Sequence, residues 1–133
     1  MAVFGLVHLH WALGGGLLLP DGLRVPDHTA LFVVDVIAIP MCAAGAALAA
    51  SFVTAVGQRI PRRWRLVAGW GTAALSLVHS TPAIVVVLGR AVGIAHDRWS
   101  TETTLSYLVY EPYWFLGGLL FLAATEGYRR RSA

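Results

Sequence analysis

Six ionisable residues lie within or at the ends of strongly apolar segments of this sequence, namely His8, His10, Asp35, His79, Arg90 and Glu111. Ionisable side chains are costly in a bilayer core, and those that occur there usually face a bundle interior or a water-filled cavity. Carboxyl and imidazole groups are also the groups that most often transfer protons in enzymes. These residues could therefore hold helices together, or they could form a site that does chemistry.

Asp35 and Glu111 are the two candidate proton donors. Asp35 lies near the start of the second apolar segment, Arg90 ends the third, and Glu111 begins the core of the fourth. On the topology argued below, all three fall in the outer half of the membrane, where Arg90 could compensate one or both carboxylates. An ion-pair lock between helices and an acid-bearing active site need the same three residues, so both interpretations stay open.

The segment "HLHWALGGG" contains two histidines that are not equivalent. Residues two apart on a helix point about 200° apart, so His8 and His10 cannot both bind one metal ion from a regular helix. We therefore expect no metal site at this pair. The alternative is a haem held by His8 and His79 from separate helices, and we expect neither it nor any other cofactor. His8 shares a helical stripe with Gly5, Trp11 and Gly15, and small residues are typical of helix contacts in membranes. The pattern predicts that His8 and Trp11 face protein, and that His10 faces lipid or a helix seam.

His79 lies three residues before a proline in the third apolar segment. Pro82 lacks an amide hydrogen, so we expect a kink near Val78, with the hydroxyl of Ser80 or Thr81 covering the exposed backbone carbonyl. A kink beside a histidine suits the floor of a pocket. His79 is accordingly a candidate base or relay, or else a buried imidazole bonded to a neighbouring helix.

The composition predicts the elements that position these residues. Of the 133 residues, 57% are hydrophobic and 13% are charged, with a mean hydropathy of +0.67. Soluble domains contain roughly 25% charged residues, so the chain is predicted to be a multi-pass protein of the cell membrane. The expected fold is all-α: one domain over 1–133 that forms an integral membrane four-helix bundle. Its spans are expected at about residues 2–19, 29–57, 65–89 and 107–127.

The arginines predict the orientation of these spans. Seven of the ten lie in "QRIPRRWR" and "YRRR", and short basic flanks beside apolar spans normally face the cytoplasm. An even number of spans then places both chain termini inside, an N-in/C-in topology. Trp64 and Tyr128 would mark the inner boundary. The acidic residues expected outside include Asp21, Asp27, Asp97 and Glu102. The location of the basic clusters beside apolar spans therefore indicates that they orient the protein in the membrane and do not bind nucleic acid.

Three short motifs in order resemble a family of small bacterial membrane proteins known as the domain of unknown function DUF3995. They are His8, Trp11, Ala12, Gly14 and Gly15, then Arg90, Ala91, Val92 and Gly93, and finally Tyr110 with Pro112. The resemblance covers essentially the whole chain and implies a four-helix architecture but no reaction. Position 10, often aromatic in such sequences, is His here. The resemblance directs attention to four residues of a shared interior: His8, Trp11, Arg90 and Tyr110.

Three functions are compatible with these patterns. The first is an integral membrane protein without catalysis that binds a lipophilic small molecule in an outer-half polar cavity, with Trp11, Arg90 and Tyr110 as binding residues. The second is a membrane enzyme of the isomerase or cyclase type, in which Asp35 or Glu111 donates a proton. The third is a transporter subunit, which would need oligomerisation to build a pathway. A block of small residues in the second span could also support a homo-oligomer.

Overall fold

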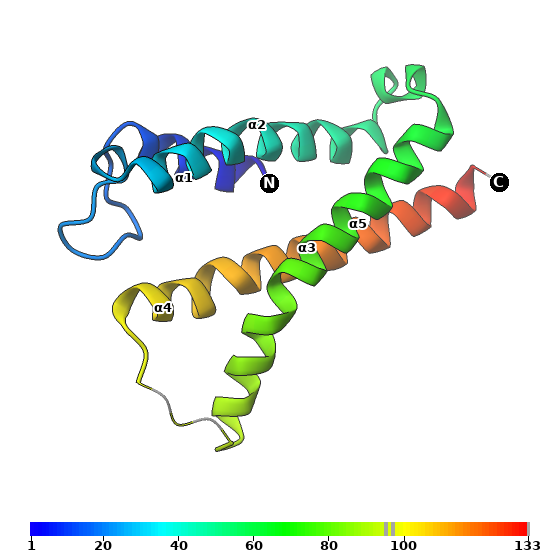
Figure 1. Ribbon diagram of the computed structural model, residues 1–133. Coiled ribbons are helices and arrows are strands. Elements are labelled where there is room, and N and C mark those ends of the chain that lie inside the picture. Colours follow the sequence, from blue (N-terminus) through cyan, green and yellow to red (C-terminus); the bar gives the residue numbers. More distant parts are fainter. Residues whose placement is uncertain (95, 97, 133) are drawn as a thin grey trace. The chain divides into compact units, whose positions relative to one another are not determined.

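The computed structural model describes residues 1–94, 96 and 98–132, and Asp97 therefore lies outside the described residues. All regular structure in this part of the chain is helical (Figure 1). The chain divides into two compact units, Met1–Ala47 and Leu48–Ala133. The long elements are α1 (Ala2–Ala12), α2 (Thr29–Ser51), α3 (Arg62–Ala91) and α5 (Glu111–Arg131). The short ones are η1 (Val25–Asp27), η2 (Val56–Arg59), α4 (Thr101–Leu105) and η3 (Ser106–Tyr110).

Three helices are long and apolar enough to cross a membrane. They are α2, α3 and the continuous helix Thr101–Arg131, which joins α4, η3 and α5. Helix α1 is apolar but shorter. The prediction of an all-helical chain with membrane-length segments is thus confirmed.

Helix α1 ends at Ala12, seven residues before the expected end of the first segment. Glycines occupy positions 14 to 16, and Gly14 has a φ of 89°, which a helix cannot accommodate. Two side chains of α1 form hydrogen bonds with the backbone of the turn that follows the helix. The Trp11 indole Nε1 donates a hydrogen bond to the Leu17 carbonyl at 2.6 Å, and the Leu17 amide donates to His10 Nε2 at 3.4 Å. The first segment is therefore a short helix followed by a held turn.

Helix α2 also ends earlier than expected, at Ser51 rather than near residue 57. The chain folds back so closely that a Cβ atom on Gly57 would overlap the backbone of Ser51. Only glycine fits this approach. The turn leads through η2 into α3, which begins at Arg62, directly after Pro61.

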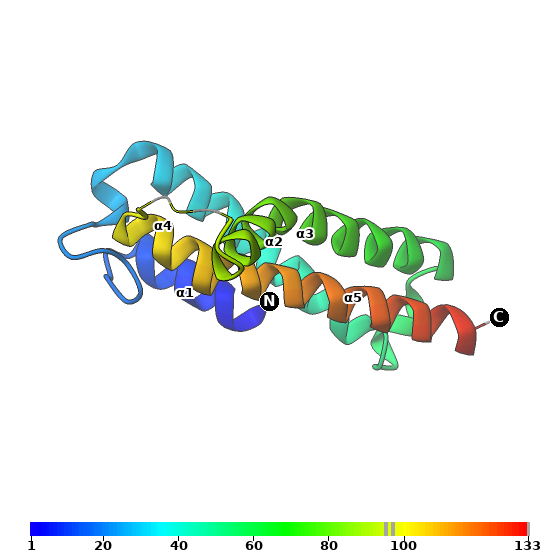
Figure 2. The same ribbon diagram turned by 90° about the horizontal axis from the view of Figure 1, so that it is seen from below.

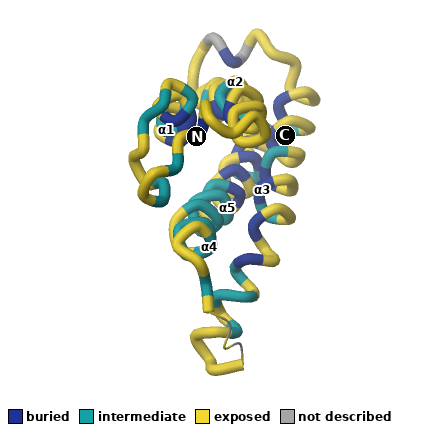
Figure 3. The backbone as a smooth tube through the Cα atoms, turned by 60° about the vertical axis from the view of Figure 1, so that its left-hand side comes forward, coloured by how far each residue is buried: buried dark blue, intermediate teal, exposed yellow. Residues whose placement is uncertain are grey.

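In the second unit, α3 and α5 lie side by side and antiparallel (Figure 2). Gly69 of α3 lies against Thr125 of α5, and Leu77 of α3 lies against Gly118. The buried positions of α3 recur every three or four residues and are mostly small, and they can be followed along the tube in Figure 3. They are Arg65, Gly69, Ala73, Ser76, Ser80 and Ala83. Close packing over small residues is the usual helix contact in lipid.

Helix α3 changes direction along its length, as Figure 1 shows. Pro82 lies inside the helix and leaves the Val78 carbonyl without its normal amide partner. The nearby hydroxyls bond earlier carbonyls: Ser80 Oγ donates to Ser76 O at 2.7 Å, and Thr81 Oγ1 donates to Leu77 O at 2.6 Å. The expected hydroxyl bonds are present, but on the two carbonyls before the one that proline exposes.

Candidate functional site

Each carboxylate singled out from the sequence has a histidine beside it. In the first unit, Nδ1 of His8 on α1 lies 2.7 Å from Oδ1 of Asp35 on α2. Both residues are buried, with side-chain exposures of 9% and 5%. A contact this short between buried groups is a charge-assisted hydrogen bond when the imidazole is protonated. It ties the first helix to the second.

Aromatic rings enclose this pair. The edge-to-face partners of the His8 ring are Phe4, with centroids 4.7 Å apart, and Trp11, with centroids 5.0 Å apart. Phe4 and Trp11 are themselves buried, whereas His10 is exposed. The predicted difference between the two histidines is therefore confirmed. The second oxygen of Asp35, Oδ2, is buried and accepts no hydrogen bond from any described residue.

A second pair lies in the second unit, between α3 and the start of α5. Nε2 of His79 is 3.6 Å from Oε1 of Glu111, within ion-pair range but longer than a good hydrogen bond. The His79 side chain is 59% exposed, whereas that of Glu111 is 15% exposed. Oε2 of Glu111 is buried and, among the described residues, has no hydrogen-bond partner. The indole of Trp114 lies edge-to-face with the His79 ring, with centroids 6.0 Å apart.

The backbone at this second pair is unusual. Residues Ser106–Tyr110 form a π-helical turn, and Glu111 and Pro112 follow it as the first residues of α5. Proline removes one amide donor at the start of α5, and a π turn is one way to accommodate such a change in bonding. Beyond this point the C-terminal end of α3 and helix α4 are drawn apart in Figure 1. Glu111 thus lies where the two helices begin to separate.

The two pairs differ in what they can do. The His8–Asp35 pair is short, buried and walled by aromatic rings, as expected of a contact that fixes two helices. The His79–Glu111 pair is longer, and its imidazole is open to the surroundings. A molecule can reach the His79 imidazole without unpacking a helix. Within the described residues, no group of three or more His, Cys, Asp or Glu side chains could hold a metal ion.

Arg90 lies away from the second pair on the same helix. It is eleven residues after His79, about 16 Å along a helix, and its guanidinium lies 4.5 Å from the centroid of the Trp99 ring. Trp99 in turn contacts Tyr107, with ring centroids 5.2 Å apart. Tyr110 is half-buried at the end of the π turn, next to Glu111. The joint cluster of Asp35, Arg90 and Glu111 stays a prediction, because Asp35 belongs to the other unit.

Sequence reasoning missed a buried arginine. Arg65 belongs to the basic cluster to which the sequence assigns a topology role, yet it is only 7% exposed. Its Nη1 donates to the Ser51 carbonyl at 3.2 Å, and its guanidinium lies 4.5 Å from the centroid of the Tyr128 ring. Tyr128 also contacts Phe52 and is buried, so its ring packs against protein. The spacing of Arg65 with Gly69 and Ala73 on one helix face could have revealed this.

The histidine–carboxylate pairing of the first unit was also missed, although a signal was present. Positions 8 and 35 lie symmetrically about the "PDG" turn at residues 20–22. Gly5 contacts Cys42, and Met1 contacts Gly45. The midpoints of these two pairs in the sequence also fall close to that turn. Treating the first two segments as a hairpin folded at that turn would have placed His8 opposite Asp35.

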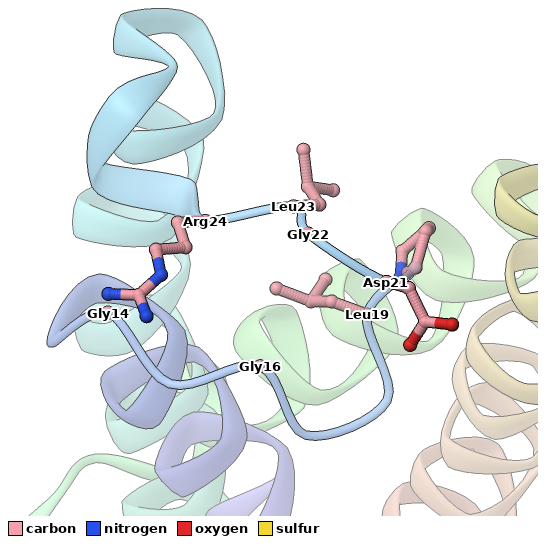
Figure 4. Close-up of a pocket in the computed structure, with 8 residues that line it drawn as sticks. Gly14, Gly16, Leu19, Asp21, Gly22, Leu23 and Arg24 are labelled. Atoms are coloured by element: carbon pink, nitrogen blue, oxygen red, sulfur yellow. The ribbon is translucent and has the colours of Figure 1, made fainter.

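An open hollow of about 280 Å³ lies in the loop that follows α1. Figure 4 shows the Arg24 side chain directed toward Gly14, while the Asp21 carboxylate points to the opposite side. The lining comes from one stretch of loop: Gly14, Gly16, Leu19, Pro20, Asp21, Gly22, Leu23 and Arg24. Neither histidine–carboxylate pair lines this hollow, so it belongs to the loop surface and not to the candidate site.

Comparison of the chain with curated proteins and with solved structures gave no match. The model of one protein family does match, and it spans residues 1–121 of the 133. That range includes both histidine–carboxylate pairs and the three motifs identified in the sequence. The chain therefore belongs to the family described as "Protein of unknown function (DUF3995)".

Proposed function

We propose that this chain is a multi-pass protein of the cell membrane that binds a lipophilic small molecule at the His79–Glu111 pair. The observation that carries the proposal is the incomplete hydrogen bonding of the buried Glu111 carboxyl group. One of its oxygens is buried without a hydrogen-bond partner among the described residues, beside an exposed imidazole. A buried polar atom without a partner is costly, and a ligand that donates a hydrogen bond would remove that cost.

Exposed apolar side chains support the membrane location. Large hydrophobic residues are exposed all around α2, including Val33, Val34, Val36 and Ile37, whereas Asp35 between them is buried. A helix that is apolar on nearly all sides is suited to lipid and not to water. In the proposed N-in/C-in topology, the arginine-rich ends of α3 and α5 face the cytoplasm. The His79–Glu111 pair then lies toward the outer half of the membrane.

The ligand class follows from the walls of the site. Trp114 lies edge-to-face with the His79 ring and Tyr110 directly precedes Glu111 in the chain, and both rings are flat, largely apolar surfaces that carry one polar group each. The carboxyl group accepts hydrogen bonds when ionised and can donate one when protonated. A hydrophobic molecule with a single hydroxyl, amine or carbonyl group fits this combination. We therefore expect a membrane-dissolved ligand with one polar head.

The test compares the small molecules that copurify with three versions of the protein. Wild type, Glu111→Gln and Glu102→Gln are purified in the same detergent, and their organic extracts are compared by mass spectrometry. Glu102 is an exposed carboxylate on α4, so its substitution is a matched control. We expect a species that is enriched with wild type and with Glu102→Gln. It should fall by about tenfold with Glu111→Gln, as expected for the loss of a hydrogen bond to a charged group.

Identical extracts from the three proteins would contradict the proposal. Circular dichroism of each variant checks that the helices are intact, so that a loss of ligand cannot be attributed to unfolding. Loss of the species with both glutamate variants would also contradict it, because the effect would then follow net charge and not position 111.

An isomerase or cyclase is the second candidate, favoured by the approach of a carboxyl group to an imidazole at 3.6 Å. Glu111 would donate a proton to the substrate and His79 would accept or relay one. Incubating the wild-type extract with the protein in deuterated water separates the two functions. Catalysis by proton transfer places deuterium on carbon in the lipophilic species and depends on Glu111. A binding protein leaves that species unlabelled.

A further inference from the structure

The start of α3 and the end of α5 are joined by hydrogen bonds that bring two basic segments together. Arg62 Nε donates to Ser132 Oγ at 2.8 Å, and Arg62 Nη2 donates to the Arg129 carbonyl at 3.3 Å. The two contacts join residues that are 70 and 67 positions apart in the sequence. One end of this helix pair therefore carries a dense set of arginines: Arg62, Arg63, Arg65, Arg129, Arg130 and Arg131.

A single carboxylate balances part of this charge. Both oxygens of Glu126 accept hydrogen bonds of 2.7 Å from Arg129, and Oε1 also accepts one of 2.7 Å from Arg130. Glu126 is therefore fully used by two neighbours on its own helix. In the part of the chain that the structure describes, no carboxylate pairs with Arg63 or Arg131, which are both exposed. This end of the helix pair has an excess of positive charge.

Because Arg65 is a buried positive charge, the lack of a nearby negative charge costs free energy. Arg65 is buried, and it contacts a backbone carbonyl and an aromatic face, neither of which carries a negative charge. Its Nε is buried and has no hydrogen-bond partner within the described ranges. Burying a guanidinium without a counter-charge is unfavourable, and an anion nearby would offset that cost.

We propose that this arginine end binds the phosphate group of an anionic phospholipid. Arg63 and Arg131 are the exposed charges that hold the phosphate, and the field of the bound anion compensates the buried Arg65. Trp64, between Arg63 and Arg65, is 57% exposed and suits the depth of lipid headgroups. Guanidinium groups bind phosphate oxygens through paired N–H donors. The partner is a lipid headgroup and not free phosphate, because the neighbouring helices are apolar and of membrane length.

The experiment uses the full-length protein in detergent, where the orientation in a membrane does not matter. Native mass spectrometry measures retained lipid after addition of phosphatidylglycerol or phosphatidylcholine to wild type and two double variants. The test variant is Arg63→Gln with Arg131→Gln. The control is Arg24→Gln with Arg98→Gln, which removes the same charge outside the arginine end. Each basic residue near an anionic lipid contributes about fivefold to binding, so the test variant, which lacks two of them, should lose about 25-fold in phosphatidylglycerol affinity.

Wild type and the control should retain phosphatidylglycerol in preference to phosphatidylcholine, and the test variant should show no preference. Equal retention of both lipids by wild type would overturn the proposal, as would equal losses in the two double variants. Thermal unfolding with millimolar inorganic phosphate separates the two sources of the anion. Phosphate alone should not raise the melting temperature, and protection by it equal to that by phosphatidylglycerol would exclude a lipid-specific site.

Discussion

At the scale of single residues, the role of each ionisable group depends on what its carboxylate or imidazole meets. Asp35 and Glu111 were equivalent candidates in the sequence. In the structure, Asp35 has a short bond to a buried imidazole, whereas Glu111 has a longer contact with an exposed one. His10, beside His8 in the sequence, accepts a hydrogen bond from the backbone that follows α1. Residue type alone predicts none of these differences.

The His8–Asp35 pair makes a prediction at this scale. His8→Leu or Asp35→Leu leaves the partner buried without its hydrogen bond, so each single variant should lose about 2 kcal/mol of stability. The double variant removes both polar groups and should be more stable than either single variant, because an apolar pair avoids the desolvation cost. Thermal unfolding in detergent measures all four proteins. A double variant whose loss equals the sum of the single losses would show that the two residues do not interact.

At the scale of elements, the helix ends predicted from hydropathy agree with the structure where the change from apolar to polar side chains sets the end of the helix. Helix α3 differs from its predicted range of 65–89 by three residues at its start and two at its end. The errors are larger where backbone geometry decides, at the glycines after α1 and at Gly57 after α2. Hydropathy identifies helices but does not specify which residues of two helices meet. For that reason the site pairings, unlike the helices, were not predicted.

The seam between α3 and α5 offers a test with an internal control. A Cβ atom on Gly69 would overlap Thr125 and Phe52, whereas a Cβ atom on Gly71 of the same helix meets nothing within 4 Å. Gly69→Ala should lower stability by about 1–3 kcal/mol through overpacking. Gly71→Ala should leave it unchanged or raise it by up to about 1 kcal/mol, because alanine favours the helix. Thermal unfolding compares the two variants, and equal melting temperatures would contradict the observed seam.

At the scale of the whole molecule, the antiparallel packing of α3 and α5 accounts for the charge pattern of the sequence. The two basic clusters lie more than sixty residues apart, yet hydrogen bonds from Arg62 hold them at one end of the second unit. The sequence predicted this shared side from the arginine positions alone. The side of the membrane that they face is a matter of orientation, and it stays a prediction.

Cysteine labelling checks that orientation. In a Cys42→Ala background, which removes the one native cysteine, single cysteines are placed at two exposed isoleucines, Ile60→Cys before α3 and Ile94→Cys after it. A membrane-impermeant maleimide should label position 94 in intact cells and position 60 only after permeabilisation. The opposite pattern would exclude the N-in/C-in topology, and labelling of both positions in intact cells would show that α3 does not cross the membrane.

The π-helical turn at Ser106–Tyr110 has a consequence for the phase of the last helix. A π turn contains more residues than an α turn, so the faces of the helix before and after it are rotated relative to each other. The stripe of α5 that contacts α3, from Gly118 to Tyr128, is therefore not continued in phase by α4. Glu111 lies seven residues before Gly118 and so shares that stripe, whereas the residues before the π turn do not. The turn thus makes Glu111 the first position of the stripe and leaves its carboxyl group at the end of the packed seam.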